Sequence, residues 1–245
     1  MAEVVYEDNH IIIVNKHPGE IVQGDKTGDE PLSETIKRYL KEKYAKPGNV
    51  FCGVVHRLDR PVGGLVIFAK TSKALSRLND MFRNGEVHKT YWAISRNRPP
   101  EEAGELTHYL TSVERSNKSF VSTTPRPNAK EARLRYRLLS SSERYHLIEV
   151  ELLTGRKHQI RTQLSAIGCP IKGDLKYGDK RSNPDGSISL MARHLEFIHP
   201  VSKQKISLDA PVPDDNLWQA LAQAIPPHTS AEAKEQTPQH PTSEA

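Results

Sequence analysis

Alternating apolar and polar positions predict a chain that is rich in β-strands. Two short strands are expected near the start, around residues 4–6 and 10–15. The same pattern predicts further strands at 54–55, 65–69, 87–95, 119–123, 131–139, 146–152, 187–195 and 205–208. Strands therefore outnumber helices and often follow one another directly. This arrangement predicts an α+β fold with a mixed, largely antiparallel central sheet flanked by helices.

Helical spacing of apolar residues occurs between these strands. The first predicted helix has apolar side chains every four positions from Leu32 to Leu40. The second would be capped by Thr71 or Ser72 and would end at Gly85. The predicted helices span residues 31–45, 71–84, 156–167 and 214–225. We expect them to flank the sheet.

The strand predicted at 131–139 has one basic face. Arginines at positions 133, 135 and 137 alternate with apolar residues, and the next predicted strand carries Glu149 and Glu151. The arginines could bind a phosphate backbone, or they could pair with the glutamates across the strands. We expect cross-strand pairing for at least some of them.

The composition is that of a globular protein with a sizeable core. The chain has 245 residues, of which 36% are hydrophobic and 27% charged. No apolar run reaches the roughly 18 residues of a membrane span, and the N-terminus lacks the features of a signal peptide. Cys52 and Cys169 are too few for a disulfide framework, which favours a reducing, cytoplasmic location. We expect one domain over 1–225 and a disordered tail over 226–245.

The net charge of +5 is concentrated in the predicted domain. Residues 226–245 carry a net charge of −2, so residues 1–225 carry +7. A basic domain favours a polyanionic partner such as nucleic acid, although charge alone does not identify one.

Residues 56–65 (HRLDRPVGGL) place one carboxylate between two guanidinium groups. Asp59 lies between Arg57 and Arg60, where a proline and two glycines favour a fixed turn between two predicted strands. Cationic neighbours favour the ionised form of an aspartate, and an ionised aspartate on a rigid turn is a candidate nucleophile or base. From these residues alone, a solvated surface charge is the commoner alternative.

Residues 154–161 (TGRKHQIR) place several hydrogen-bond donors at the start of the third predicted helix. Backbone N–H groups and the helix dipole at this end also favour an anion such as phosphate or carboxylate. On a helical period, His158, Arg161 and Ser165 share one face. A solvated basic face is the alternative. Arg161 lies beside the apolar stripe, where its guanidinium would need a carboxylate partner.

Motifs of several other functional classes are missing from the sequence. Histidines at 56, 88, 158, 194 and 199 fit no zinc spacing, and no paired cysteines or HExxH sequence accompanies them. No P-loop, GxGxxG or GxSxG sequence is present, so a nucleotide cofactor and a serine hydrolase are unsupported. We therefore expect neither a metal site nor a nucleotide cofactor.

Five segments of the chain carry a shared pattern. They are HRLDRPVGGL at 56–65, KTYWA at 89–93, GRKHQIR at 155–161, GCPIKGDLKYG at 168–178 and LEFIHP at 195–200. In this order they resemble the RluA-type family of RNA pseudouridine synthases, whose signature is HRLDxxTSGL and whose helix start is GRxHQIR. The resemblance spans about residues 6–210.

The resemblance implies a pseudouridine synthase catalytic domain without the N-terminal S4 RNA-binding domain of many relatives. It implies isomerisation of a uridine in RNA to pseudouridine, without a metal or an organic cofactor. We expect a stem-loop of rRNA or tRNA as the substrate and take a monomer as the default, with the oligomeric state left open. Asp59 would be the nucleophile, Tyr91 would stack on the target base with a part in proton transfer, and Arg161 would form an ion pair with Asp59. The substrate-binding positions would be His56, Arg57, Arg60, Arg156, His158, Gln159 and Leu190.

The expected chemistry needs a flipped base and an ionised carboxylate. Uracil must leave the helical stack to be reached, and Tyr91 would offer an aromatic platform. Asp59 could attack C1′ or C6 of the nucleotide, and the sequence does not choose between them. A proton must leave C5 of the detached base, for which Tyr91 or a water is the candidate base.

The chain departs from the family pattern at three places. Val62 and Gly63 stand where the family has Thr and Ser. Pro18 is displaced by one position from the usual NKPxG, and Met191 replaces a usual histidine. The loss of two hydroxyls motivates an alternative, a non-catalytic RNA-binding or RNA-folding protein. A hydrolase with paired carboxylates is ranked last, because no second carboxylate stands out beside Asp59.

Overall fold

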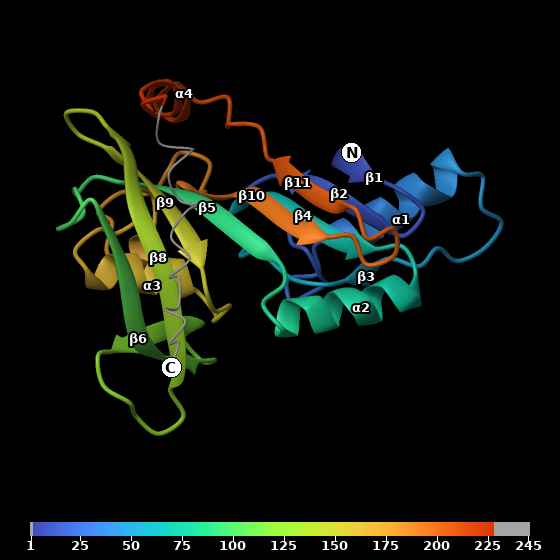
Figure 1. Ribbon diagram of the computed structural model, residues 1–245, viewed down its shortest axis with the longest axis horizontal. Coiled ribbons are helices and arrows are strands. Elements are labelled where there is room, and N and C mark those ends of the chain that lie inside the picture. Colours follow the sequence, from blue (N-terminus) through green and yellow to red (C-terminus); the bar gives the residue numbers. More distant parts are fainter. Residues whose placement is uncertain (1, 228–245) are drawn as a thin grey trace, which may run out of the picture.

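The computed structural model describes residues 2–227, and within them eleven strands form one sheet (Figure 1). The strands are β1 (Glu3–Glu7), β2 (Ile11–Lys16), β3 (Gly53–Val54), β4 (Gly63–Ala69), β5 (His88–Ser95), β6 (Ala103–Val113), β7 (Lys118–Ser122), β8 (Lys130–Ser141), β9 (His146–Leu152), β10 (Leu190–Ile198) and β11 (Lys205–Asp209). Their order is β1-β2-β4-β10-β5-β9-β8-β6-β7, with β11 paired to β10 and β3 to β4. Among these strands, β10 and β4 pair in parallel and the others pair antiparallel. The predicted mixed, largely antiparallel sheet is confirmed.

Four α-helices of the described chain cover the two faces of this sheet. They are α1 (Leu32–Lys43), α2 (Ser72–Arg83), α3 (Gln159–Ala166) and α4 (Asn216–Gln223), and a 3₁₀ helix, η1 (Leu175–Tyr177), follows α3. Apolar residues of α1 and α3 belong to one buried cluster, and those of α2 and α4 belong to another. Figure 1 shows α1 and α2 towards one end of the sheet and α3 towards the other.

Alternation along the strands assigns side chains to the two faces. In β2, Ile12 joins the cluster with α1 and α3, whereas Ile13 joins the cluster with α2 and α4. In β5, Tyr91 and Trp92 divide in the same way. Leu58, in the loop before β4, packs in the cluster that contains Tyr91. The loop and Tyr91 therefore share one face of the sheet.

Strand β6 was not predicted, although it is eleven residues long. Its inward-facing positions include Gly104 and His108, so the apolar alternation that identifies a strand is weak there. Strand β6 pairs with both β7 and β8. The chain segment between β5 and β7 is therefore part of the sheet rather than a long loop.

The arginines of β8 pair with glutamates on the neighbouring strands. Arg133 and Arg135 both contact Glu105 of β6, at 2.7 and 3.1 Å. Arg137 contacts Glu149 of β9 at 2.7 Å. The predicted cross-strand pairing is confirmed, with β6 as an unforeseen partner.

The sheet divides along β10. Its residues Met191 and Ala192 pair in parallel with Gly63 and Gly64 of β4, and its later residues pair with β11. Gly64 has a φ of +108°, and a Cβ atom there would overlap the carbonyl oxygen of Ala192. Only glycine allows this close approach. The loop that carries Asp59 enters β4 at this fork.

The sequence predicts that the third helix begins at residue 156, but α3 begins at Gln159. His158 stands at the N-cap with a φ of 54°, in the left-handed region, so the helix cannot extend back through it. Arg156 and Lys157 therefore lie in the preceding turn. The oxygen of the Gln159 side chain accepts the N–H of Arg156 at 2.9 Å and closes this turn.

The tail predicted over 226–245 lies outside the described residues from 228 onward. The single domain predicted over 1–225 stays a prediction, although the two buried clusters share one continuous sheet. No helix within residues 2–227 is long and apolar enough to cross a membrane.

Candidate active site

Asp59 lies in the loop between β3 and β4, where the backbone is held in a turn. The N–H of Val62 donates to the carbonyl oxygen of Asp59 at 3.0 Å. The buried ammonium group of Lys16 donates to the carbonyl oxygens of Arg60 and Val62, at 3.1 and 2.6 Å. Burial lowers the pKa of Lys16 to about 8. The turn presents a carboxylate that is 31% exposed.

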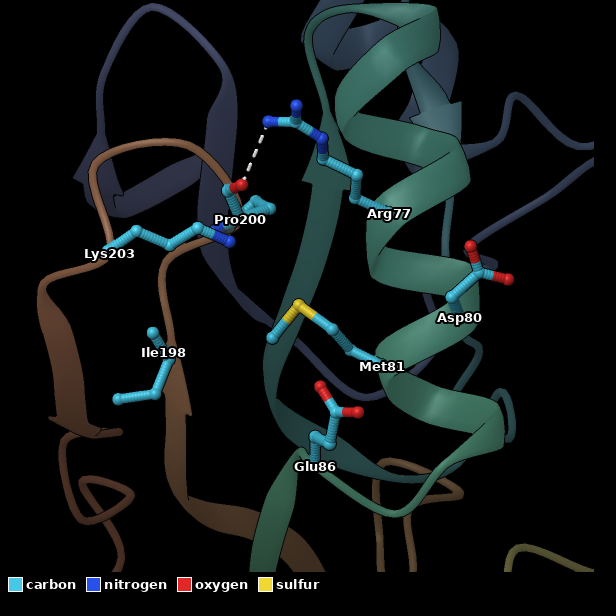
Figure 2. Close-up of a pocket in the computed structure, with 7 residues that line it drawn as sticks. All are labelled: Arg77, Asp80, Met81, Glu86, Ile198, Pro200 and Lys203. Carbon is cyan, nitrogen blue, oxygen red and sulfur yellow. Dashed lines mark hydrogen bonds between the residues drawn. The ribbon is translucent and has the colours of Figure 1, made fainter.

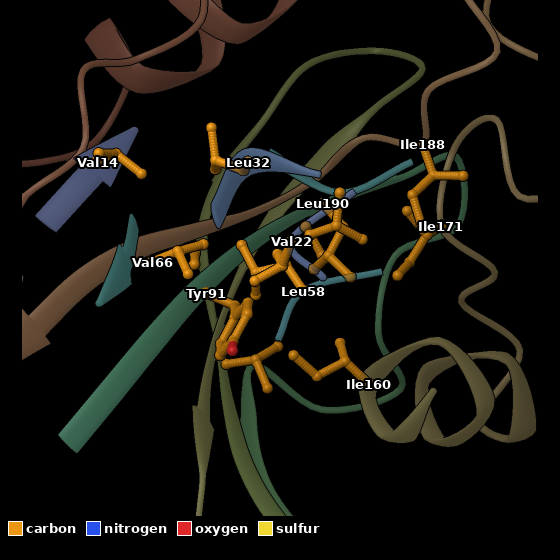
Figure 3. Close-up of a cluster of buried hydrophobic side chains, with 14 of the residues drawn as sticks. Val14, Val22, Leu32, Leu58, Val66, Tyr91, Ile160, Ile171, Ile188 and Leu190 are labelled. Carbon is orange, nitrogen blue, oxygen red and sulfur yellow. The ribbon is translucent and has the colours of Figure 1, made fainter. Parts of the chain in front are cut away.

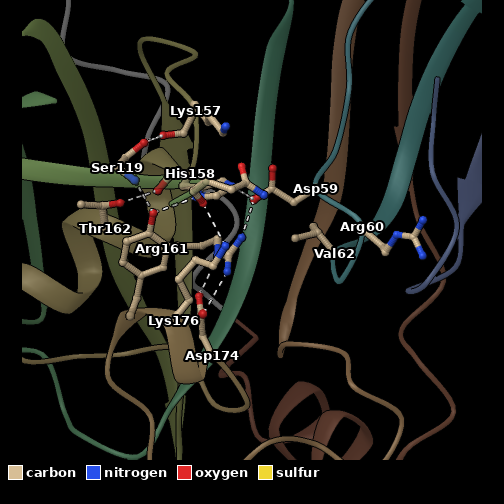
Figure 4. A network of polar contacts seen from close by, with 12 residues as sticks. Asp59, Arg60, Val62, Ser119, Lys157, His158, Arg161, Thr162, Asp174 and Lys176 are labelled. Atoms are coloured by element: carbon tan, nitrogen blue, oxygen red, sulfur yellow. Dashed lines mark hydrogen bonds and ion pairs between the residues drawn. The ribbon is translucent and has the colours of Figure 1, made fainter. Parts of the chain in front are cut away.

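Arg161 joins Asp59 to a second carboxylate (Figure 4). Its Nη1 donates to Asp59 Oδ2 at 2.8 Å, while Nε and Nη2 donate to the two oxygens of Asp174 at 2.7 and 3.0 Å. The side chains of Arg161 and Asp174 are only 7% and 1% exposed. Burial acts to lower the pKa of Arg161, but the hydrogen bonds and charges of both carboxylates raise it. The bidentate pair fixes the guanidinium plane and hence the hydrogen bond to Asp59.

His158 contacts the other side of this network. Its Nδ1 lies 2.8 Å from the hydroxyl of Tyr177, which also accepts the N–H of Ser119 at 2.8 Å. The hydroxyl hydrogen can then point to Nδ1, an arrangement that matches the neutral tautomer with its proton on Nε2. Nε2 lies 3.6 Å from Asp59 Oδ2. Burial lowers the pKa of His158 to about 4, although Asp59 acts in the opposite sense. The imidazole that faces the carboxylate is therefore neutral at pH 7.

Tyr91 belongs to the apolar side of the site (Figure 3). It is buried in one cluster with Leu58, Ile160 and Leu190, the last being the predicted apolar wall. Burial and the negative charge of Asp59 both raise the pKa of Tyr91. Its hydroxyl therefore stays protonated at neutral pH and is a hydrogen-bond donor.

The arginines that flank Asp59 in the sequence have other environments. Arg60 donates through Nη2 to Asp29 and Thr27, at 2.5 and 2.9 Å. Arg57 is exposed and has no ion-pair partner among residues 2–227. The structure therefore leaves Arg57 open to solvent and ties Arg60 to a neighbouring loop.

His56 packs on the face of the sheet that α2 covers, opposite to the face that holds Tyr91. Its Nε2 accepts the N–H of Ile67 in β4 at 3.1 Å, and its ring stacks on Phe82 of α2 with centroids 4.8 Å apart. Burial, with the nearby charge of Lys89, lowers the pKa of His56 to about 3. These contacts anchor the loop to α2. A contact of His56 with RNA stays a prediction.

Arg156 and Gln159 also have protein partners. Nε of Arg156 donates to the carbonyl oxygen of Glu131 at 2.8 Å, although the residue is exposed. The amide of Gln159 is buried and donates to the carbonyl oxygen of Arg133 at 3.0 Å. Both side chains thus tie the turn before α3 to β8. Their predicted contacts with RNA stay predictions.

The departures from the family pattern meet at the fork of the sheet. A Cβ atom at Gly63 would lie 3.3 Å from the carbonyl oxygen of Lys16 and 3.4 Å from Cδ of Pro18. A serine at 63 would be tightest against the carbonyl oxygen of Lys16 and would also touch the displaced proline, so the glycine leaves room for both. Met191 is buried and pairs with Gly63 in the sheet. The departures are therefore adjacent in space, outside the contacts of Asp59 with Arg161.

A surface pocket of about 290 Å³ lies apart from this network, beside α2 (Figure 2). Its lining includes Arg77, Asp80, Glu86 and Lys203 but none of the predicted site residues. Arg77 donates to the carbonyl oxygen of Pro200 at 2.9 Å. Within the described residues, no cluster of three His, Cys, Asp or Glu side chains could hold a metal ion. Neither observation points to a rival site.

Asp174, Tyr177 and Lys16 were missing from the predicted site residues. Asp174 and Tyr177 lie in one of the five shared segments, but a motif does not say which of its side chains face the site. A usable signal was present at Arg161. A guanidinium has five N–H donors, and when it is buried one carboxylate cannot accept from all of them. A second carboxylate beside Asp59 could therefore have been expected.

Comparisons with known proteins identify the family of this chain. Residues 10–166 match the family described as RNA pseudouridylate synthase. The chain is 33% identical to the tRNA pseudouridine synthase C of Vibrio vulnificus over 239 residues, which cover 90% of this chain and 94% of the relative. It is 32% identical to the ribosomal large subunit pseudouridine synthase D of Zymomonas mobilis, with 87% and 70% covered.

Solved structures share the fold. Human RNA Pseudouridylate Synthase Domain Containing 4 superposes with a TM-score of 0.73 at 24% identity, over 91% of this chain and 92% of the human one. The fold is therefore that of a pseudouridine synthase. Because the family match covers more than half of the chain and the relatives align over most of it, the protein belongs to the RluA-type family of RNA pseudouridine synthases.

Proposed function

We propose that this RNA pseudouridine synthase uses Asp59 as its nucleophile and acts on structured rRNA or tRNA. The assignment is carried by one observation: the part-exposed carboxylate of Asp59 is held by Arg161, whose other edge is held by Asp174. A carboxylate open on one side and fixed on the other can bond to a substrate in a set direction.

In the proposed reaction, the target uridine leaves the stack and its base packs beside Tyr91. Asp59 attacks C1′ or C6 of the nucleotide, the N1–C1′ bond breaks, and the uracil turns while it stays bound. A C5–C1′ bond then forms and the bond to Asp59 breaks. C5 loses its proton and N1 gains one, so the product is an isomer of the substrate and no cofactor is consumed.

Tyr91 is proposed as a stacking platform and hydrogen-bond donor rather than as a phenolate base. Burial and the charge of Asp59 raise its pKa, which disfavours the phenolate. A water is then the better candidate to take the proton from C5. A proton on Nε2 of His158 would help to stabilise the carboxylate of Asp59 whenever that carboxylate is not bonded to the substrate.

The proposed substrate class rests on the relatives and on the charge. The Vibrio vulnificus relative is named for tRNA and the Zymomonas mobilis relative for the ribosomal large subunit. The charge of +7 on residues 1–225 favours a phosphate backbone. We propose that these residues act as one catalytic unit, as a monomer in the cytoplasm, on a uridine presented by a stem-loop.

Tritium release from RNA labelled at uracil C5 tests the proposal. The wild-type enzyme should release tritium from bulk tRNA or rRNA, and Asp59→Asn should not. Asp80→Asn, which alters an exposed carboxylate on α2, should behave as wild type. Equal release by wild type and Asp59→Asn would remove Asp59 from the mechanism. Mapping of pseudouridines in cells with and without the protein would then identify the modified site.

A further inference from the structure

A hairpin beside the site exposes an aromatic ring next to an ammonium group. Strands β6 and β7 form the hairpin, and β7 is the last strand of the sheet. Phe120 on β7 is 49% exposed. The Nζ of Lys118 lies 5.7 Å from the centroid of its ring and 5.4 Å from that of Tyr177. The hairpin therefore presents an aromatic ring and a cation side by side.

Hydrogen bonds tie this hairpin to the catalytic network. Ser119, the residue before Phe120, donates its N–H to the hydroxyl of Tyr177 at 2.8 Å. That hydroxyl contacts Nδ1 of His158 at 2.8 Å, and Nε2 of His158 faces Asp59. The ring of Phe120 therefore has a fixed position relative to the nucleophile.

Three lysines in this region form no ion pair with a carboxylate of the described chain. Lys118, Lys157 and Lys176 have no ion-pair partner within residues 2–227. Lys176 donates to the carbonyl oxygen of Asn117, at the tip of the hairpin, at 2.9 Å. The charges of Lys157 and Lys176 act on His158, which places them at the edge of the network. The carboxylates of the site are already held by its buried arginine.

Other exposed aromatic residues of the described chain lack this combination. Phe51 is 43% exposed, but no cation lies over its ring among residues 2–227. Tyr44 is surrounded by lysines, yet two of them, Lys43 and Lys70, form ion pairs with Glu7. Two lysines beside Tyr44 are thus engaged in ion pairs, whereas the three lysines beside the hairpin are not.

We propose that Phe120, Lys118, Lys157 and Lys176 form a docking surface for an unpaired nucleotide next to the target uridine. Its base stacks on Phe120, and the adjacent phosphates contact the three ammonium groups. Aromatic rings bind unpaired bases of any sequence, and lysines add a salt-dependent attraction. Three ammonium groups without ion pairs, beside an exposed ring, favour RNA over a peptide segment as the occupant. The inference rests on the proposed function, since it deepens how the same site holds its substrate.

Binding of a fluorescein-labelled oligouridylate to the full chain tests the ring. All variants carry Asp59→Asn, so that turnover does not enter. Phe120→Ala should weaken binding about 5- to 100-fold. Phe120→Tyr should restore most of the affinity, and Phe120→Leu should not, because it lacks a π-face. Phe51→Ala is the matched control and should leave binding unchanged. An unchanged affinity in Phe120→Ala, or an equal loss in Phe51→Ala, overturns the proposal.

The salt dependence of binding tests the lysines. Replacing each of the three by glutamine should reduce the slope of log K against log salt by about 0.7, and replacing all three by about 2. Lys73→Gln, on α2, should leave the slope unchanged. RNA that contains 4-thiouridine should cross-link under ultraviolet light to the peptide that contains Phe120. An unchanged slope in the triple variant contradicts the proposed phosphate contacts.

Tritium release separates this inference from the proposed function. If Phe120→Ala in the otherwise wild-type enzyme raises KM more than it lowers kcat, the docking surface is supported. An active wild type with an unaltered KM in Phe120→Ala overturns the docking surface and leaves the function standing. A wild type that binds the oligouridylate through Phe120 but releases tritium from no RNA overturns the function and leaves the surface standing.

Discussion

Two arginines of the candidate site, Arg161 and Arg57, differ in burial and in what holds them. Arg161 is 102 positions from Asp59 in the sequence, yet it donates to Asp59 and is buried against Asp174 as well. Arg57 is two positions from Asp59, but it is exposed and without an ion pair within residues 2–227. A buried guanidinium cannot turn away without leaving charges uncompensated, whereas an exposed one can reorient to meet a phosphate. The fixed cation orients Asp59, the proposed nucleophile, and the free cation is the one proposed to contact RNA.

The largest expected effect comes from removing the fixed cation. Arg161→Ala would leave Asp174 buried without a partner and should lower the free energy of unfolding by about 3–5 kcal/mol. It should also abolish tritium release. Urea denaturation followed by circular dichroism measures the first effect. Arg57→Ala is the matched control and should unfold at the same urea concentration as wild type.

Asp174→Asn sharpens this test, because it keeps the volume of the side chain. The variant should lose about 1–3 kcal/mol of stability and stay folded. With its plane less firmly held, Arg161 should orient Asp59 less well, and kcat should fall by up to about 100-fold while RNA binding changes little. A kcat equal to that of wild type would show that Arg161 does not need its second carboxylate.

The next effect concerns the pH dependence of stability, through His158. Its pKa is about 4 in the folded protein and near 6.5 when unfolded. Below pH 6.5 the unfolded chain therefore binds a proton that the folded chain takes up only near pH 4. The contribution of His158 to the free energy of unfolding should be fully present above pH 6.5. It should fall by about 1–3 kcal/mol as the pH approaches 4.

The variant His158→Gln separates this residue from the other histidines. The pKa of His56 is also lowered in the folded protein, so part of the acid sensitivity should remain in the variant. Urea denaturation near pH 7 and near pH 5 measures the difference. Replacement of the exposed His88 should not change it. An acid sensitivity equal to that of wild type in His158→Gln would contradict the buried neutral imidazole.

The sequence predicted those residues of the candidate site to which the family resemblance gives a role. It missed those that contact the site only because of the tertiary fold. Pairing of Asp59 with Arg161 came from the resemblance, because the local sequence places two other arginines closer to Asp59. The second carboxylate, Asp174, was missed because its segment was recognised as a turn and not as part of the site. Burial and orientation of Tyr177 likewise depend on contacts between distant segments. Such contacts are set by the tertiary fold rather than by local periodicity.

The fold was predictable wherever the apolar pattern was strong. The helix with Thr71 at its N-cap and Gly85 after its end was predicted within two residues, since both residues have direct physical roles. Strand β6 was missed because Gly104 and His108 occupy inward positions. The start of α3 was placed too early because His158 adopts a left-handed conformation that nothing in its side chain demands.

A smaller effect is expected from restoring the usual serine of the family at Gly63. Its Cβ would lie 3.3 Å from the carbonyl oxygen of Lys16 and 3.4 Å from Cδ of Pro18, so Gly63→Ser should cost about 1 kcal/mol of stability. Pro18→Ala removes the second of these contacts. The double variant should therefore be more stable than the sum of the single effects predicts, by about 0.5 kcal/mol or more. Strict additivity in urea denaturation would show that the two departures are independent.

The smallest effects on stability are expected for the arginines that flank Asp59. Arg60 pairs with Asp29, but both side chains are about half exposed, so Arg60→Ala should change stability by no more than about 0.5 kcal/mol. Their effects on RNA should differ. Arg57→Ala removes a free cation and should lower the salt slope of oligouridylate binding by about 0.7, whereas Arg60→Ala should lower it less.

Asp29→Asn tests the reason for that difference. It breaks the ion pair of Arg60 without removing the guanidinium, so it should strengthen binding of RNA slightly and should make a subsequent Arg60→Ala more costly for affinity. Thr27, which also accepts from Arg60, would still limit its reach. If Arg60→Ala weakens binding as much as Arg57→Ala in the presence of Asp29, then an exposed ion pair does not withhold a cation from RNA. In that case, burial alone separates the arginine that orients the nucleophile from those that bind substrate.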